Sequence, residues 1–218
     1  MATCEVIQLS VVTFRPDLSP PYSPPAPPSA FLDVAAKLQA VPGARASYLG
    51  YQLEDSRRWV WVVRWATGAA LDAFLASPSY ARWLGSLRAV ADTYASSRAF
   101  LRGDIAASLN SPCTEVVTAL EADPGFVEDH LRPFARCFER EPAKIPGYRA
   151  LSYGQWLPVV HDGVVAPVGV SAGMLIGWES KEAHYAQRGE GMLIDRYVHH
   201  IRGGRKSLGL YHVNFTRL

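Results

Sequence analysis

Two kinds of hydrophobic pattern alternate along the first half of the chain. Runs rich in Val, Ile, Leu and Trp predict strands, and apolar residues spaced three and four apart predict helices. In order, the predicted elements are a strand at 4–12, a helix at 29–41 that Ser29 caps, strands at 45–53 and 58–65, helical turns at 68–90 that Ser77-Pro78 interrupts, and a strand at 97–102. The order is therefore β-α-β-β-α-β.

The second half of the chain repeats this order. Its predicted elements are a strand at 114–121, a helix at 126–138, strands at 149–157 and 169–178, a long helix from Ser180 to about Ile201, and a closing strand at 207–216. Pro133 predicts a kink or a restart within its helix, because proline cannot donate the backbone hydrogen bond. His161-Asp162-Gly163 has the chemistry of a hairpin turn.

Short sequence matches show that the two halves are copies. Pro42-Gly43-Ala44-Arg45 to Gly50 recurs as Pro146-Gly147-Tyr148-Arg149 to Gly154, at an offset of 104 (42 to 146). The Glu5 and Glu115 segments match, as do the Trp65 and Trp178 segments. We therefore predict a tandem duplication, with a first ferredoxin-like repeat at 1–103, a linker at 104–112 and a second repeat at 113–218. The proline-rich loop at 16–28 is a stiff surface connection, a lid or a ligand for a proline-recognising domain.

One unit of this kind forms an antiparallel sheet with both helices on the same face. Its other face is apolar and needs cover in water, and the second copy supplies that cover. The predicted fold class is therefore α+β, with two ferredoxin-like β-α-β-β-α-β repeats fused into one barrel.

A family resemblance rests on the segment Trp178-Glu179-Ser180-Lys181-Glu182-Ala183-His184, of which Trp65 to Ala70 is a weaker copy. With the order of elements, it resembles the dimeric α/β-barrel superfamily, which implies an intramolecular dimeric α/β barrel. The superfamily includes cofactor-free monooxygenases, polyketide cyclases, haem-degrading enzymes and muconolactone isomerases. A fused tandem is similar to members that lie beside natural-product pathways.

The chain departs from two of these subgroups. The cyclase-type run Tyr-x-x-His-Pro-x-His has no match, because 74–80 and 185–191 both lack its histidines. The haem-degrading type pairs a helical histidine with an asparagine, and neither His130 nor His184 has such a partner in sequence.

Composition and charge exclude several classes of protein. A net charge of +2 among 218 residues does not indicate a nucleic-acid-binding surface. No apolar run is long enough for a membrane span, and the N-terminus does not resemble a secretory signal. The three cysteines, Cys4, Cys113 and Cys137, are typical of reduced thiols in a cytoplasmic protein.

The closing strand carries the strongest candidate for chemistry. Alternation places Leu210, His212 and Asn214 on one face. We expect His212 to be either an acid/base that Asn214 orients or a hydrogen-bonded core histidine. Tyr153 could supply a phenol to the same pocket.

Other candidates are weaker. His130 lies on the apolar stripe of its helix, either in the core or facing the pocket, and His184 is expected to face solvent. The substrate-binding candidates are Trp156, Met174, Leu210 and Arg64. No spacing typical of a metal site is present, and no cofactor is expected.

The leading hypothesis is therefore an enzyme that uses no cofactor to cyclise or dehydrate an aromatic or polyketide-like substrate in an apolar pocket. A cofactor-free monooxygenase of a hydroquinone or anthrone and a non-catalytic binding protein are the alternatives. Either a monomer or a homodimer is consistent with the sequence. Because the repeats diverge most at the second unit's hairpin and closing strand, we expect one unit to keep the pocket and the tryptophan-rich unit to give structural support.

Overall fold

The computed structural model describes residues 5–18, 25–159 and 170–218. Part of the proline-rich loop and the predicted turn at His161-Asp162-Gly163 lie outside these ranges. The first repeat contains β1 (Val6–Phe14), α1 (Ser29–Gln39), β2 (Ala44–Gln52), β3 (Asp55–Trp65), α2 (Gly68–Leu75), α3 (Pro78–Arg88) and β4 (Ala91–Gly103). Thr67 and Ser77 cap α2 and α3 through their side-chain oxygens. The predicted cap at Ser29 is wrong, because Ser29 is the first residue of α1 and its side chain caps nothing.

The second repeat follows a short helix, α4 (Ile105–Leu109), which occupies the predicted linker. It contains β5 (Cys113–Ala122), a π-helical turn η1 (Val127–Leu131), α5 (Arg132–Arg140), a 3-10 turn η2 (Pro142–Lys144), β6 (Tyr148–Val159), β7 (Val170–Trp178), α6 (Lys181–Ala186), α7 (Leu193–Tyr197), a 3-10 turn η3 (Val198–Ile201), β8 (Arg205–Val213) and β9 (Thr216–Arg217). The restart at Pro133 is confirmed. The single long helix after Ser180 is wrong, because Gly189 and Gly191 have positive φ and break it.

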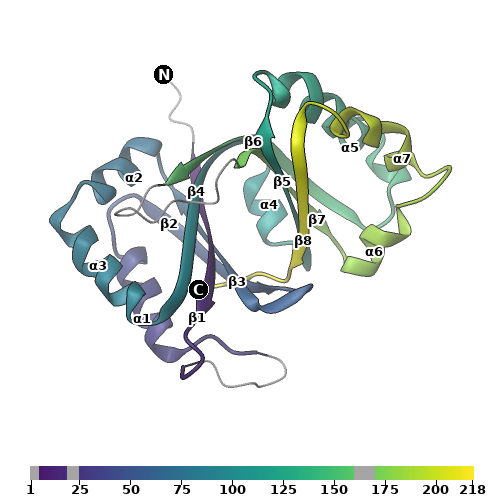
Figure 1. Cartoon of the computed structure of the whole chain (residues 1–218). Coiled ribbons are helices and arrows are strands. Elements are labelled where there is room, and N and C mark those ends of the chain that lie inside the picture. The colour runs from purple at the N-terminus through teal and green to yellow at the C-terminus, as the bar shows by residue number, and fades with distance from the viewer. Residues whose placement is uncertain (1–4, 19–24, 160–169) are drawn as a thin grey trace.

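The strands close into a barrel that both repeats share. Their order is β3-β1-β4-β6-β7-β5-β8-β2, and β2 also pairs with β3, which completes the ring. Helices α1 to α3 lie on one flank and α5 to α7 on the opposite flank, with the strands between them (Figure 1). Within the described residues, the helices are too short or too polar to cross a bilayer.

Alternate residues of each strand serve two different cores. One set points into the barrel, where Leu9, Val60, Val116, Leu175 and others form a common cluster with Ile105 and Leu109 of α4. The other set faces outward and packs under the helices of its own repeat. Each copy thus covers the other's apolar sheet face, which confirms the predicted fold.

The Pro-Gly matches have a common structural cause. Gly43 and Gly147 have φ of 92° and 80°, a region that side chains rarely adopt. A Cβ added at Gly43 would lie 2.5 Å from the Cβ of Ala70, and one added at Gly147 would lie 2.6 Å from the Cβ of Ala183. The same turn therefore packs against the same helix start in both copies.

The Glu5 to Glu115 match, in contrast, is three residues out of register. Val6 pairs with Trp65, and Cys113 pairs with Trp178 at the equivalent strand position. The structural counterpart of Glu115 is therefore Gln8. Both accept a hydrogen bond from the tryptophan N–H of their own repeat.

The two seams between the repeats differ in extent. Strands β4 and β6 pair continuously from Ser96 and Val159 to Gly103 and Ser152. On the other side β2 meets β8 only at Gln52 and Val213, and β9 adds a short pairing with Tyr48 and Leu49. The second seam therefore has less backbone pairing to hold it.

We predict that Gly154→Ala weakens the long seam. A Cβ at Gly154 would lie 2.0 Å from the carbonyl oxygen of Phe100 on the neighbouring strand. Because backbone must move to relieve this clash, the free energy of unfolding should fall by about 1–3 kcal/mol. Urea unfolding measures the change. Gly85→Ala is the control: this helical glycine has nothing within 4 Å of its added Cβ, and a stability gain of about 0.5–1 kcal/mol is expected. Equal effects at the two glycines would contradict the seam argument.

Candidate active site

The second repeat encloses a cavity of about 460 Å³ between its sheet and its helices. The sheet contributes the floor and helices α5 to α7 contribute the walls and rim. Most of the lining is apolar, with one histidine, one buried carboxyl group and charged groups toward the rim. The lining residues are Glu115, Val117, Phe134, Phe138, Met174, Ile176, Trp178, His184, Arg188, Gly189, Ile194, Asp195, Val198, Ile201, Arg202, Leu208 and Leu210.

The equivalent layer of the first repeat is filled by aromatic side chains. Trp61 contacts Phe31 and Trp83 with ring centroids 5.1 and 6.0 Å apart, and Phe74 packs on Trp65. The two histidines and the buried carboxyl group of the second repeat are replaced there by other residue types. By strand register and helix position, Gln8, Leu71 and Arg98 stand where the second repeat has Glu115, His184 and His212.

A chain of hydrogen bonds leads from the cavity to the first repeat. His184 on α6 bonds through Nδ1 to Nε2 of His212 on β8, at 2.7 Å. His212 bonds through Nδ1 to Oε1 of Glu54 at 2.7 Å, and its backbone N–H donates to Oε2 of Glu54 at 2.9 Å. Glu54 lies in the turn between β2 and β3 and also pairs with Lys181 at 2.8 Å. Both histidines are buried, whereas Glu54 is partly exposed.

This chain determines where the ring protons lie. An ionised carboxylate only accepts hydrogen bonds, so Nδ1 of His212 carries the proton that Glu54 accepts. Nε2 of His212 is then the acceptor for the Nδ1–H of His184. The remaining nitrogen of His184, Nε2, keeps its lone pair, and His184 is one of the residues that line the cavity. It is 3.7 Å from Oε1 of Glu115, too far for a hydrogen bond, and is therefore available to a substrate.

Burial sets the charge states around this nitrogen. Burial, followed by the positive charges of His212 and Arg188, lowers the pKa of His184 to about 3, and burial also lowers the pKa of His212 although Glu54 opposes it. Burial alone would raise the pKa of Glu54, but the hydrogen bonds from Lys181 and His212 outweigh it and hold the pKa near 2. At neutral pH the site thus pairs two neutral imidazoles with an anion at its outer end.

Glu115 has the opposite character. Burial raises its pKa to about 7, although the Trp178 N–H, which donates to Oε2 at 2.9 Å, favours the anion. The Trp178 indole also stacks on the His184 ring, with centroids 5.2 Å apart. The cavity therefore places an uncharged imidazole with a free ring nitrogen beside a carboxyl group that exchanges its proton near neutral pH.

Glu115, His184 and His212 are also of the residue types that bind metals, and their nearest ligand atoms lie within 4.8 Å of one another. The geometry is that of a hydrogen-bond chain. A tetrahedral ion holds two ligand nitrogens ~3.3 Å apart, whereas the two imidazole nitrogens are 2.7 Å apart with a proton between them. Both ring nitrogens of His212 are engaged in hydrogen bonds, so these groups do not fit a metal site as they stand.

The structure brings three of the residues predicted from sequence to the site. His212 is the middle member of the chain, and Met174 and Leu210 line the cavity. Asn214 does not orient His212, because β8 ends at Val213 and Asn214 is exposed. Glu54 fills that role.

The other predicted site residues lie elsewhere. Tyr153 is buried under the helices of the second repeat but does not line the cavity. His130 stacks on Phe126 and bonds through Nδ1 to the carbonyl of His200. Trp156 points into the barrel, and Arg64 pairs with Glu5 near a small pocket by α4.

Sequence reasoning missed Glu54, Glu115, Trp178 and His184 as site residues. His184 was expected to face solvent, yet it is buried. A usable signal was present: His184 lies four residues after the helix cap Ser180, so it is on the same helix face and turns toward the sheet. Glu54 left no signal, because nothing in a polar turn predicts a contact 158 residues away.

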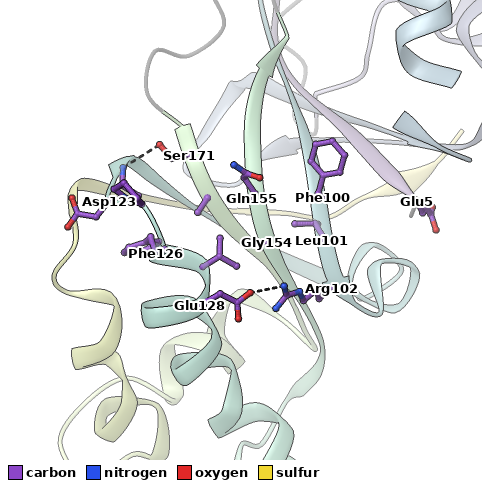
Figure 2. A pocket seen from close by; sticks show the side chains of 15 residues that line it. Glu5, Phe100, Leu101, Arg102, Asp123, Phe126, Glu128, Gly154, Gln155 and Ser171 are labelled. Atoms are coloured by element: carbon purple, nitrogen blue, oxygen red, sulfur yellow. Dashed lines mark hydrogen bonds and ion pairs between the residues drawn. The ribbon is translucent and has the colours of Figure 1, made fainter. Parts of the chain in front are cut away.

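A larger and more open groove of about 580 Å³ lies beside the β4–β6 seam. Figure 2 shows Arg102 of β4 pointing toward Glu128 of η1, with which it forms an ion pair. The groove lacks a histidine and a buried carboxyl group. The smaller cavity is therefore the better candidate active site.

We predict that Glu115→Gln stabilises the protein only at higher pH. The folded-state pKa of about 7 exceeds the ordinary 4.5, so the native carboxyl group holds its proton where the unfolded one has lost it. Its contribution is complete below pH 4.5 and is lost as the pH rises through 7. The amide keeps an acceptor for Trp178 without ionising, so the variant should gain on the order of 2–3 kcal/mol relative to the parent at pH 8, and little at pH 4.5.

Urea unfolding of the variant and the parent at both pH values measures this difference in stability. Because both proteins contain His184, its own pH-dependent contribution cancels. Glu128→Gln is the control, because the pKa of this exposed carboxyl group is lowered by Arg102 and Arg132. It should show a small change of opposite sign. A Glu115→Gln difference that does not depend on pH would contradict the assigned charge state.

Fold and cavity together define a class: two ferredoxin-like repeats fused into one α/β barrel, with a largely apolar cavity in the second repeat. A sequence model of the antibiotic biosynthesis monooxygenase family matches residues 28–85. This segment lies in the first repeat, which contributes Glu54 to the site but does not contain the cavity.

Solved structures share the fold over the whole chain. An anthrone oxidase-like protein matches with a TM-score of 0.65 and 14% identity, over 97% of this chain and 91% of that one. A putative monooxygenase from Fusobacterium nucleatum matches with a TM-score of 0.63 and 10% identity over 100% and 95%, and one from Lactobacillus acidophilus with 0.60 and 11% over 98% and 94%. No curated protein matches by sequence at a significant level. At these identities the likeness establishes the fold.

Proposed function

We propose that the second repeat, residues 113–218, is a cofactor-independent oxygenase that acts on an anthrone- or hydroquinone-like aromatic substrate. The observation that supports this most directly is the chain from His184 to Glu54, which leaves one imidazole nitrogen as a proton acceptor inside an apolar cavity. The family match in the first repeat and the fold shared with an anthrone oxidase-like protein agree with it.

The proposed reaction needs no electron source besides the substrate. Nε2 of His184 removes a proton from the activated CH₂ of an anthrone, and the resulting carbanion transfers one electron to O₂. The substrate radical and superoxide combine to a peroxide. Loss of the second C–H proton and cleavage of the O–O bond then give the quinone carbonyl and water. One substrate and one O₂ thus yield one quinone and one H₂O.

The lining residues favour this chemistry in two ways. The apolar walls lower the local dielectric and hold a planar aromatic ring away from water. Glu115, with its raised pKa, can return a proton to the departing oxygen. Arg188 and Arg202 at the rim favour a substrate that carries phenolate or carboxylate groups.

Proton-transfer chemistry without oxygen is the second candidate. The same base and acid would serve a cyclisation or dehydration, because neither step needs anything beyond His184 and Glu115. The test uses 1,8-dihydroxyanthrone with an oxygen electrode and a quinone absorbance assay. We expect one O₂ consumed per quinone formed, above the rate without protein. Turnover of an aromatic or polyketide substrate without oxygen uptake would favour the second candidate, and binding without turnover would favour a carrier.

A further inference from the structure

The site in the second repeat is held in part by a residue of the first. We propose that Glu54 is a positioning residue that fixes the ring tautomers of His212 and His184 from across the repeat boundary, and this inference rests on the proposed function of His184 as the base. Glu54 is not among the residues that line the cavity. It acts through His212.

The first support is that Glu54 makes up for missing strand pairing at the short seam. Backbone pairing between β2 and β8 ends at Gln52 and Val213. Beyond it, Leu53 donates its N–H to the carbonyl of His212 at 2.8 Å, and the Glu54 carboxylate accepts the N–H of His212 at 2.9 Å. The turn of the first repeat therefore forms hydrogen bonds with both the backbone carbonyl and the backbone N–H of His212.

The second support is that the Glu54 position must be an acceptor at both oxygens. Oε2 receives the backbone N–H of His212, and Oε1 receives both Lys181 Nζ and the ring Nδ1. Two of these donors, the backbone N–H and the ammonium group, cannot act as acceptors. A glutamine amide at this position would have to point its NH₂ group, which is itself a donor, at one of these three donor groups.

The consequence is transmitted along the imidazoles. If the amide of Glu54→Gln keeps its oxygen on the backbone N–H, its NH₂ faces Nδ1 of His212 and donates to it. His212 must then carry its proton on Nε2 and donate to Nδ1 of His184. The proton of His184 moves in turn to Nε2, which is the nitrogen that should accept a proton from substrate. A substitution at the partly exposed Glu54 thus blocks the buried base His184 without changing any residue that lines the cavity.

The experiment compares Glu54→Gln with two controls in the 218-residue chain. Glu182→Gln removes a neighbouring negative charge of α6 that makes no hydrogen bond to His212 among the described contacts. Lys181→Met removes the ion pair and leaves the His212 bonds in place. Ring ¹⁵N chemical shifts of histidine at pH 7.5 report the tautomers and need no substrate. Initial rates with 1,8-dihydroxyanthrone give kcat and KM.

We expect Nδ1–H tautomers for both histidines in the parent and in both controls, and Nε2–H tautomers in Glu54→Gln. The kcat of Glu54→Gln should fall about 100-fold with KM within threefold, and the controls should stay within about fivefold. Glu54→Gln with unchanged tautomers overturns the proposal, as does a switch of tautomers that leaves kcat intact.

If the parent shows no oxygen uptake but the tautomers switch as stated, the proposed function fails and the positioning of the histidines by Glu54 stands. If Glu54→Gln does not fold, Glu54→Asp carries the test. It accepts at both oxygens but is one methylene too short to reach both N–H groups of His212. A lower kcat together with a partial loss of the Nδ1–H tautomers supports the proposal, and unchanged tautomers or an unchanged kcat overturn it.

Discussion

His184→Asn is expected to abolish most of the turnover while the protein stays folded. The amide nitrogen of asparagine lies near the position of the imidazole Nδ1, so it still donates to Nε2 of His212, which accepts that bond at 2.7 Å in the parent. The lone pair at Nε2, which is the proton acceptor of the proposed mechanism, is lost. Loss of a general base lowers the rate 10²–10⁴-fold, and we expect kcat to fall by about that factor.

His130→Asn is the matched control for this variant. His130 is another helical histidine of the second repeat, and it too uses Nδ1 for a hydrogen bond, to the carbonyl of His200. It does not line the cavity, so kcat should remain within about twofold of the parent. Stopped-flow oxidation of 1,8-dihydroxyanthrone and circular dichroism spectra decide the matter. Equal kcat values for the two variants would remove His184 from the mechanism.

The fold was predictable because it depends on hydrophobic periodicity and on duplication, and both can be recognised in short stretches of sequence. Alternating residues such as Trp59, Trp61, Val63 and Trp65 identify a strand and its buried face from four side chains. Helix caps such as Thr67 and Ser180 bond within three residues. The barrel then follows from one physical requirement, that two apolar sheet faces must be covered.

The site was less predictable, because its bonds link residues that no pattern relates. His212 stood out as a histidine in a buried strand, but its partner Glu54 belongs to the other repeat. The choice of Asn214 assumed that the strand continues past Val213. In the structure the chain leaves the strand there and passes over Gly50, where a Cβ would lie 2.5 Å from the Asn214 carbonyl oxygen.

The duplication also led to a wrong alignment of the two repeats at one position. The Glu5 match drew attention to a residue that pairs with Arg64, whereas the true counterpart of Glu115 is Gln8. The two carbonyl-type acceptors receive the same tryptophan bond, yet only the carboxyl group titrates. A duplicated scaffold thus conserves packing and hydrogen bonds more strictly than it conserves the chemistry of a site.

The division of labour between the repeats predicts the largest loss of stability for Trp61→Ala. Trp61 is buried among the rings of the first repeat, and its N–H donates to Oγ of Ser47 at 2.7 Å. Truncation removes the ring contacts, leaves a cavity and strands the Ser47 hydroxyl. Removing a buried tryptophan costs about 3–5 kcal/mol, which for a chain of this size lowers Tm by about 10 °C.

Leu210→Ala is the informative comparison, because this side chain is 37% exposed and lines the cavity of the second repeat. It should cost less than about 1 kcal/mol but raise KM for the aromatic substrate several-fold. Trp61→Ala, measured well below its Tm, should leave KM unchanged. Thermal unfolding and initial rates for both variants separate the two roles. A side chain that only supports the fold should affect stability when it is truncated, whereas one that binds substrate should affect KM. A higher KM in Trp61→Ala with a normal KM in Leu210→Ala would therefore place substrate in the first repeat and refute the assignment of the cavity.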